Sequence, residues 1–279
     1  MGASTLVKIC NMKALFFLYL LFPGLWSGAQ LVAGPATGSV HQLLAYSRQQ
    51  PLILSFPNNQ AALALTKGFA AALYGERKYG LPELGCYRLA AGFETKGGVF
   101  GLNAAYGGGA FYSERWAGLA YARSMQRVDV GIQFNVYGSG AAGYKPVTAF
   151  SAELGLLFQV RESLRAGFHL NNPGGFANAP GVRLPFIYSI GFGYEPSKLL
   201  FIGAEVKKSE DERPDLRLAC QYRFHDRATA SLGLQTGAAS FCIGLSFWFG
   251  PVRTEFSVSL HPYLGLTPSL LLGYQKQQP

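Results

Sequence analysis

Acidic, basic and amide side chains recur at every second position in several stretches of the sequence. In Val128–Tyr137, for example, Asp129, Gln133 and Asn135 alternate with valine, isoleucine and phenylalanine. Side chains of these types can form ion pairs, hold an ion, or act as general acids and bases. The residues of this kind that we expect to share one face are Asp129, Gln133, Asn135, Glu153, Arg165, His169, Glu205, Lys207, Arg217, Arg223 and Glu255.

Acids and bases fall on consecutive segments of this alternating pattern. Glu153 is followed by Arg165 on the next segment, and Glu205 by Arg217. Charges enclosed inside a protein are tolerated when they are paired or stay wet. The order of the charges therefore predicts an interior cross-linked by structural ion pairs, and a narrow or plugged pore, rather than a substrate path.

Catalytic and metal-binding patterns do not stand out. Gly138-Ser-Gly-Ala-Ala-Gly143 matches a dinucleotide-binding glycine pattern, but Tyr144-Lys-Pro146 follows where a helix should open, so we predict a loop. The four histidines have no acidic or cysteine partner at ligand spacing, and Cys86, Cys220 and Cys242 are widely spaced. We therefore predict no enzyme activity, no metal and no cofactor. The histidines are His41, His169, His225 and His261.

The elements that carry these residues read as β-strands, because strict alternation has a period of two. Charged residues make up 14% of the chain, against about 25% in soluble domains. Beyond the first 25 residues there is no apolar run of the ~18 residues that a membrane helix needs. This combination predicts an all-β fold, a transmembrane antiparallel β-barrel of about 14 strands. The expected strands are 68–77, 84–94, 98–107, 116–125, 128–137, 147–160, 163–171, 185–195, 198–207, 214–224, 227–236, 240–249, 252–261 and 266–275.

Short and longer connections alternate between these strands. Gln126-Arg127 and Gly250-Pro251 are short, whereas 138–146 and 172–184 are long. Outer-membrane barrels have short periplasmic turns and longer outer loops, and an even number of strands places both ends of the barrel on the periplasmic side. A soluble β-sandwich is the alternative, but it carries more charge. Tyrosines near strand ends could form aromatic girdles: Tyr87, Tyr106, Tyr194, Tyr222 and Tyr274.

The first 29 residues have the features of a signal peptide. Lys8 and Lys13 precede an apolar stretch, and Ser27-Gly-Ala29 fits the cleavage rule. Translation could also start at Met12, which would give a more ordinary positive region. Basic residues of the remaining chain are scattered singly, which argues against nucleic acid as a partner. We divide the chain into a signal peptide (1–29), a plug segment (30–67) and a barrel (68–276).

Residues 30–67 do not alternate. Val40–Arg48 is mildly helical in pattern, and Asn58–Leu65 reads as a short helix that an asparagine caps. An apolar helix directly before the first strand must be buried, and the lumen of the barrel is nearby. We therefore predict that residues 40–66 form a plug.

The plug segment also carries a resemblance to a known family. Asn59-Gln-Ala-Ala-Leu-Ala64 resembles the Asn-Pro-Ala-Gly-Leu-Ala hatch motif of the PorV/PorQ family, relatives of the FadL-type fatty-acid transporters, although Gln60 replaces proline and Ala62 replaces glycine. Short motifs in the same order, such as Gly118–Arg123 and His261–Pro268, extend the resemblance over nearly all of 50–275. It implies a fourteen-stranded outer-membrane barrel of the kind found in Bacteroidota. The candidate hatch residues are Asn58, Asn59, Gln60, Ala61, Ala62 and Leu63.

Three functions remain open at this point. The resemblance implies a barrel in the outer membrane of a Gram-negative bacterium, surrounded by outer-membrane lipid, that binds or passes hydrophobic small molecules. It equally allows a barrel associated with type IX secretion, which binds cargo or secretion-system proteins, and a structural barrel without transport. The lining of the lumen discriminates between them: an apolar pocket favours transport, and a fully ion-paired plug favours the other two.

Overall fold

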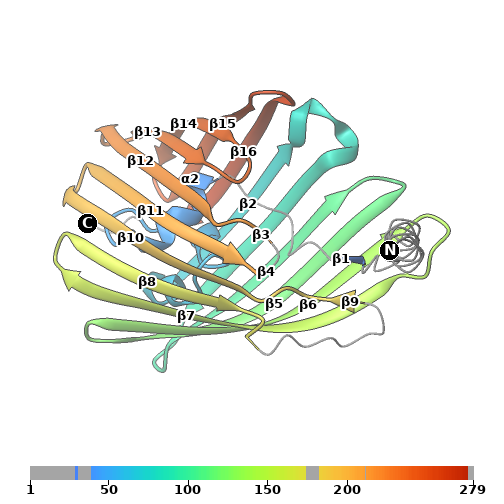
Figure 1. Cartoon of the computed structure of the whole chain (residues 1–279). Coiled ribbons are helices and arrows are strands. Elements are labelled where there is room, and N and C mark those ends of the chain that lie inside the picture. The colour runs from blue at the N-terminus through green and yellow to red at the C-terminus, as the bar shows by residue number, and fades with distance from the viewer. Residues whose placement is uncertain (1–28, 31–38, 174–181, 211, 276–279) are drawn as a thin grey trace, which may run out of the picture.

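The computed structural model describes residues 29–30, 39–173, 182–210 and 212–275. Fourteen antiparallel strands close into a single barrel, and the pairing of β16 with β2 completes the ring (Figure 1). The predicted barrel is therefore confirmed. Almost all of the predicted signal peptide, residues 1–28, lies outside the described residues.

Each barrel strand lies within a few residues of its predicted position. The strands are β2 (Phe69–Arg77), β3 (Gly85–Glu94), β4 (Val99–Gly108), β5 (Tyr112–Met125), β6 (Val128–Ala141), β7 (Val147–Arg161), β8 (Leu164–Asn171), β10 (Ile187–Ser197), β11 (Leu200–Ser209), β12 (Asp215–His225), β13 (Ala228–Gln235), β14 (Ser240–Phe249), β15 (Val252–His261) and β16 (Gly265–Gln275). The agreement follows from the membrane, which imposes alternation on every strand.

The prediction was wrong at the start of β5 and at the end of β6. β5 begins at Tyr112 and β6 continues to Ala141, so the segment predicted as a loop from Gly138 is strand as far as Ala141. Tyr112 lies opposite Ala141 in the ladder, and this backbone pairing holds residues of low strand propensity in place. Two further strands, β1 (Ala29–Gln30) and β9 (Val182–Arg183), form a separate parallel pair that the sequence did not predict.

The two ends of the barrel differ in their connections. We call one the short-turn end, where the connections are 95–98, 126–127, 162–163, 198–199, 226–227 and 250–251. At the other, the long-loop end, they are 78–84, 109–111, 142–146, 172–186, 210–214, 236–239 and 262–264. The first of these loops contains η4 (Lys78–Gly80) and η5 (Pro82–Leu84). β2 begins and β16 ends at the short-turn end, as the even strand count predicts.

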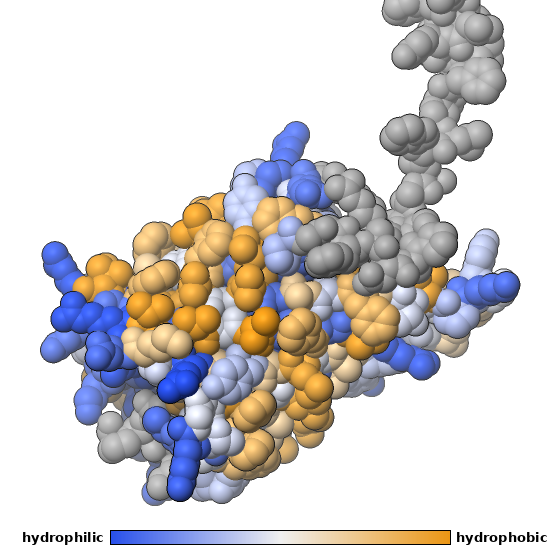
Figure 2. Space-filling view, turned by 90° about the horizontal axis from the view of Figure 1, so that it is seen from below, coloured by the Kyte–Doolittle hydropathy of each residue, from blue (hydrophilic) through white to orange (hydrophobic). Residues whose placement is uncertain are grey.

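The outer surface is apolar around its middle (Figure 2). On β6, Phe134 is 62% exposed whereas its neighbour Gln133 is 0% exposed, so the polar face points inward. None of the described helices has the length and hydrophobicity of a membrane-spanning helix. The tyrosines expected at the girdles are exposed on the outside near strand ends: Tyr87 and Tyr106 at the long-loop end, and Tyr194, Tyr222 and Tyr274 at the short-turn end.

The chain before β2 folds inside the barrel. It forms α2 (Ser39–Leu43), η1 (Leu44–Tyr46), η2 (Ile53–Ser55) and η3 (Gln60–Leu65), and we call residues 39–66 the plug (Figure 1). Buried leucines and Phe56 of the plug share one apolar core with small inward residues of the wall, such as Ala72 and Ala122. Small wall residues leave room for the plug, which replaces the side chains that would otherwise fill the lumen.

Candidate functional site

The wall contacts the plug through glycines that lie opposite each other on neighbouring strands. A Cβ placed on Gly131 would lie 2.5 Å from the amide nitrogen of Ala61, and one on Gly193 would lie 2.9 Å from the carbonyl carbon of Tyr46. These are contacts with plug backbone, which cannot rotate away. The plug is therefore seated directly on the strands. The paired glycines are Gly92 with Gly101, Gly131 with Gly155, Gly167 with Gly191, and Gly193 with Gly203.

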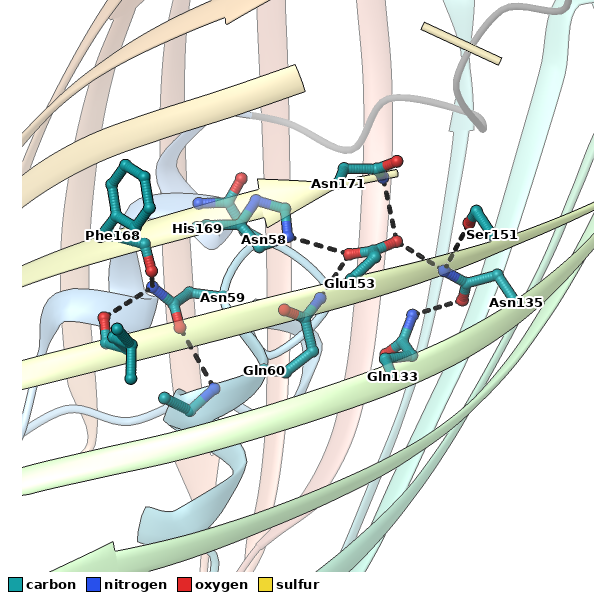
Figure 3. A network of polar contacts seen from close by, with 12 residues as sticks. Asn58, Asn59, Gln60, Gln133, Asn135, Ser151, Glu153, Phe168, His169 and Asn171 are labelled. Atoms are coloured by element: carbon teal, nitrogen blue, oxygen red, sulfur yellow. Dashed lines mark hydrogen bonds and ion pairs between the residues drawn. The ribbon is translucent and has the colours of Figure 1, made fainter. Parts of the chain in front are cut away.

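A buried carboxylate, that of Glu153 on β7, joins the plug to the wall at mid-barrel (Figure 3). One of its oxygens accepts hydrogen bonds from Asn135 Nδ2 at 2.6 Å and Asn171 Nδ2 at 3.0 Å. The other oxygen lies 2.9 Å from His169 Nε2 and accepts from the Gln60 amide of the plug. Four polar partners compensate the loss of water around this carboxylate.

Glu205 on β11 makes a second connection of the same kind. Its Oε2 accepts hydrogen bonds from the Tyr46 hydroxyl at 2.6 Å and Asn58 Nδ2 at 2.7 Å, and both donors belong to the plug. Arg217 Nη1 lies 3.6 Å from its other oxygen and also donates to the plug residue Gln42. Glu205 and Arg217 thus form the neighbouring acid–base pair that the alternation predicted.

Two further glutamates hold the first part of the plug. Glu195 on β10 accepts from the Ser47 hydroxyl at 2.6 Å and from the backbone amides of Arg48 and Gln49 at 3.0 Å each. Glu255 on β15 lies 2.6 Å from His41 Nε2. All four carboxylates come from strands, and each contacts a different part of the plug.

Glu255 is also held from the wall side. Its Oε2 accepts from Arg253 at 2.6 Å and from the Ser246 hydroxyl at 2.7 Å. The Glu255 carboxylate is therefore paired with a wall residue, Arg253, as well as with His41 of the plug. A buried carboxylate needs such a partner.

Asn59 has two roles in the plug. Its side-chain oxygen accepts from the amide of Ala61 at 3.1 Å, which caps η3 as the sequence predicted. Its side-chain nitrogen donates to the carbonyl oxygens of Leu156 at 3.3 Å and Phe168 at 3.2 Å. These two carbonyls belong to β7 and β8, so the asparagine bridges neighbouring strands.

The other candidate hatch residues lie around Asn59. Gln60, Ala61, Ala62 and Leu63 are buried, and Leu63 packs against the Gly92–Gly101 pair. Asn58 is partly buried and bonds Glu205.

Most of the polar residues that we predicted to share one face are buried inside the barrel. Lys207 and Arg223 are only partly buried, and the other members are buried. Glu153 and Arg165 do not pair, because the register places Glu153 opposite Asn171, toward the long-loop end, and Arg165 pairs with Asp129 instead. The buried members are Asp129, Gln133, Asn135, Glu153, Arg165, His169, Glu205, Arg217 and Glu255.

Sequence reasoning missed Glu195, His41, Tyr46 and the glycine pairs. Glu195 had a signal, because it continues the inward register of Gly191 and Gly193 at the end of β10. The plug residues had none, since their partners lie more than a hundred residues away.

An aromatic group lines the long-loop half of the lumen. Trp116 and Tyr137 stack with ring centroids 5.9 Å apart, and the Arg88 guanidinium lies 4.8 Å from the Trp116 ring centroid. Leu184, from the loop after β8, packs into the same cluster. In the described part of the chain no group of histidine, cysteine and acidic side chains could hold a metal ion.

The sequence matches no protein-family profile and none of the curated proteins compared with it. The fold is similar to solved structures of barrels. The TodX monoaromatic hydrocarbon channel, as its deltaS2 mutant, has a TM-score of 0.61 at 8% identity over 82% of this chain and 95% of that chain.

The Ralstonia pickettii toluene transporter TbuX has a TM-score of 0.54 at 12% identity, covering 81% of this chain and 93% of its own. The P. putida toluene transporter TodX has 0.58 at 8% identity, covering 88% and 99%. At such low identity the likeness shows the fold alone.

Proposed function

We propose that this chain is an outer-membrane barrel of the PorV/PorQ type that passes hydrophobic small molecules, with the plug as its gate. The observation that carries the proposal is a plug seated in the lumen of a barrel whose fold is shared with hydrocarbon channels. The motif order, from the hatch-like Asn59–Ala64 segment to His261–Pro268, supports the family.

The interior supports a gate because its contacts are of a reversible kind. The plug is held by hydrogen bonds, ion pairs and van der Waals contacts, and no described cysteine forms a disulfide. On the long-loop side of the plug, Trp116, Tyr137 and Leu184 form a second, buried apolar cluster. A molecule entering there would meet the plug next, so passage requires the plug to shift.

Locking the plug to the wall tests this proposal. A Cβ on Gly203 would lie 3.3 Å from Leu43 Cβ, close to the ~3.5–4.5 Å of a disulfide. We would combine Leu43→Cys with Gly203→Cys in a chain whose own cysteines are replaced by alanine. Uptake of radiolabelled toluene and of a radiolabelled fatty acid would be measured in cells expressing it.

We expect uptake above that of cells without the protein, a fall to that background when the disulfide forms, and recovery on reduction. Leu43→Cys alone, under the same oxidant, is the control and should keep its uptake. Background uptake by the unmodified protein, or full uptake through the locked one, would contradict a plug-gated path.

A binding barrel in type IX secretion is the second candidate. The observation that favours it is the number of wall contacts of the plug, since four glutamates must all release it before a path can open. In that case a deletion strain would secrete poorly, secretion-system subunits would co-purify with the barrel, and the disulfide lock would change neither.

A further inference from the structure

Basic side chains gather at the short-turn end of the barrel. Arg127, Lys198 and Arg227 occupy three of its turns, Lys96 a fourth, and the strand ends add Arg123 and Arg161. All are exposed, and we call them the basic rim. The acidic residues near them are fewer: Glu94, Glu162 and Asp226.

The basic rim is not neutralised within the described part of the chain. None of its side chains forms an ion pair with a described residue, and the nearby Glu94 is paired with Lys67 at 3.1 Å. The long-loop end differs, since its exposed basic and acidic residues, among those described, are close in number, four against three. The basic ones are Arg77, Arg115, Lys145 and Arg213, and the acidic ones are Glu83, Glu210 and Glu212.

The rim lies where the apolar belt ends. Met125 is 55% exposed and stands two residues before Arg127, and Val160, at 53%, directly precedes Arg161. Leu199 follows Lys198 and is exposed as well. Figure 2 shows hydrophilic side chains beyond the end of the apolar band. Charges at this depth lie at the level of lipid headgroups.

We propose that the basic rim binds the headgroups of anionic phospholipids in the membrane leaflet that faces the short-turn end. Lysine and arginine near an anionic membrane surface are attracted to it, and each such residue favours binding roughly fivefold. The rim spreads over turns around the barrel, next to lipid-facing side chains. This favours lipid over an acidic protein, which would need a patch on one side.

The position of Arg123 shows that the rim faces the membrane and not the lumen. Arg123 lies opposite Val130 in the ladder, so both side chains are on the outer face of the barrel. An arginine on that face, just inside the turn at 126–127, reaches the membrane interface and not the lumen. The proposal is independent of transport, because it concerns the outside of the wall.

Lipid retained by the folded barrel tests the proposal. The protein would be reconstituted in vesicles of phosphatidylethanolamine and phosphatidylglycerol, extracted in mild detergent, and its bound lipid identified by native mass spectrometry. We expect phosphatidylglycerol to be enriched roughly fivefold over the bulk mixture. The variant Arg127→Gln, Arg161→Gln, Lys198→Gln, Arg227→Gln keeps only Lys96 and Arg123 of the rim and should lose most of this enrichment.

A matched control removes the same charge from the opposite end. Arg77→Gln, Arg115→Gln, Lys145→Gln, Arg213→Gln should keep the enrichment. Enrichment by the unmodified protein should also fall as salt increases, which needs no variant. No preference in the unmodified protein, equal loss in both variants, or insensitivity to salt would each overturn the proposal.

Discussion

At the scale of single residues, we expect substitution of the buried Glu153 to destabilise the protein. Its carboxylate is 1% exposed and has partners on β6, β8 and the plug. Glu153→Gln removes the charge and turns one acceptor into a donor that faces other donors. We expect the free energy of unfolding in urea to fall by about 3 kcal/mol, as when one partner of a buried pair is lost.

The control for this change is Glu94→Gln at the short-turn end. Its carboxylate is 38% exposed and pairs with Lys67, whose side chain is 61% exposed. Such a surface pair contributes at most ~1 kcal/mol. Equal losses in the two variants would show that burial does not decide the role of Glu153.

The environment of Tyr46 predicts how the stability of the protein depends on pH. Burial first, and then the nearby Glu205 carboxylate, raise the pKa of Tyr46 above its ordinary value. A raised folded-state pKa gives stability that is complete below the unfolded pKa of about 10 and is lost as pH rises above it. Tyr46→Phe should therefore destabilise the protein by about 2 kcal/mol at pH 7.

This loss should shrink above pH 10, since phenylalanine has no proton to release. Urea unfolding of both proteins at neutral and alkaline pH gives the comparison. A difference between the two proteins that stays constant with pH would show that the Tyr46 hydroxyl is not the buried, Glu205-bound group described above.

At the scale of elements, the seat of the plug depends on the glycine pairs. Gly131→Ala would place a methyl group against the backbone of Gln60 and Ala61. We expect η3 to shift, at a cost of about 2 kcal/mol. A cysteine introduced as Ala62→Cys, buried in the native plug, should then react faster with a maleimide.

Gly138→Ala is the matched control on the same strand. A Cβ there has only the carbonyl oxygen of Val147 near it, at 3.9 Å, so neither stability nor labelling of the cysteine at 62 should change. Slow labelling in the Gly131→Ala background would show that the plug tolerates the methyl group and that the glycine pairs do not determine its seat.

The strands could be predicted from the sequence for a physical reason. A strand with lipid on one side and the lumen on the other must alternate, so Val128–Tyr137 shows its own facing. The partners of the inward charges could not be predicted. Arg165 on β8 pairs with Asp129 on β6, and this pairing depends on the register of both strands with β7. Glycines such as Gly131 have low strand propensity, and the sequence gives no reason for their positions. The reason is the plug, whose backbone lies where their side chains would be.

At the scale of the whole molecule, the few charges of the chain are divided between the outer and the inner face of the barrel. The outer belt excludes charge, and the inward carboxylates of Glu153, Glu195, Glu205 and Glu255 are taken up by the plug and its neighbours. The lumen of the barrel is therefore occupied by a part of the protein's own chain.

Deleting residues 39–66 should open the barrel. The plug fills the short-turn half of the lumen, and without it the four glutamates would lose their plug partners and become hydrated, as in water-filled barrels. We expect the intact protein in planar bilayers to show little ion conductance and the deletion variant to conduct steadily. The disulfide between positions 43 and 203 supplies the control, because it should hold the intact protein closed. A deletion variant that folds, as judged by heat-dependent migration in gels, and yet does not conduct would show that the strands and their loops close the lumen without the plug.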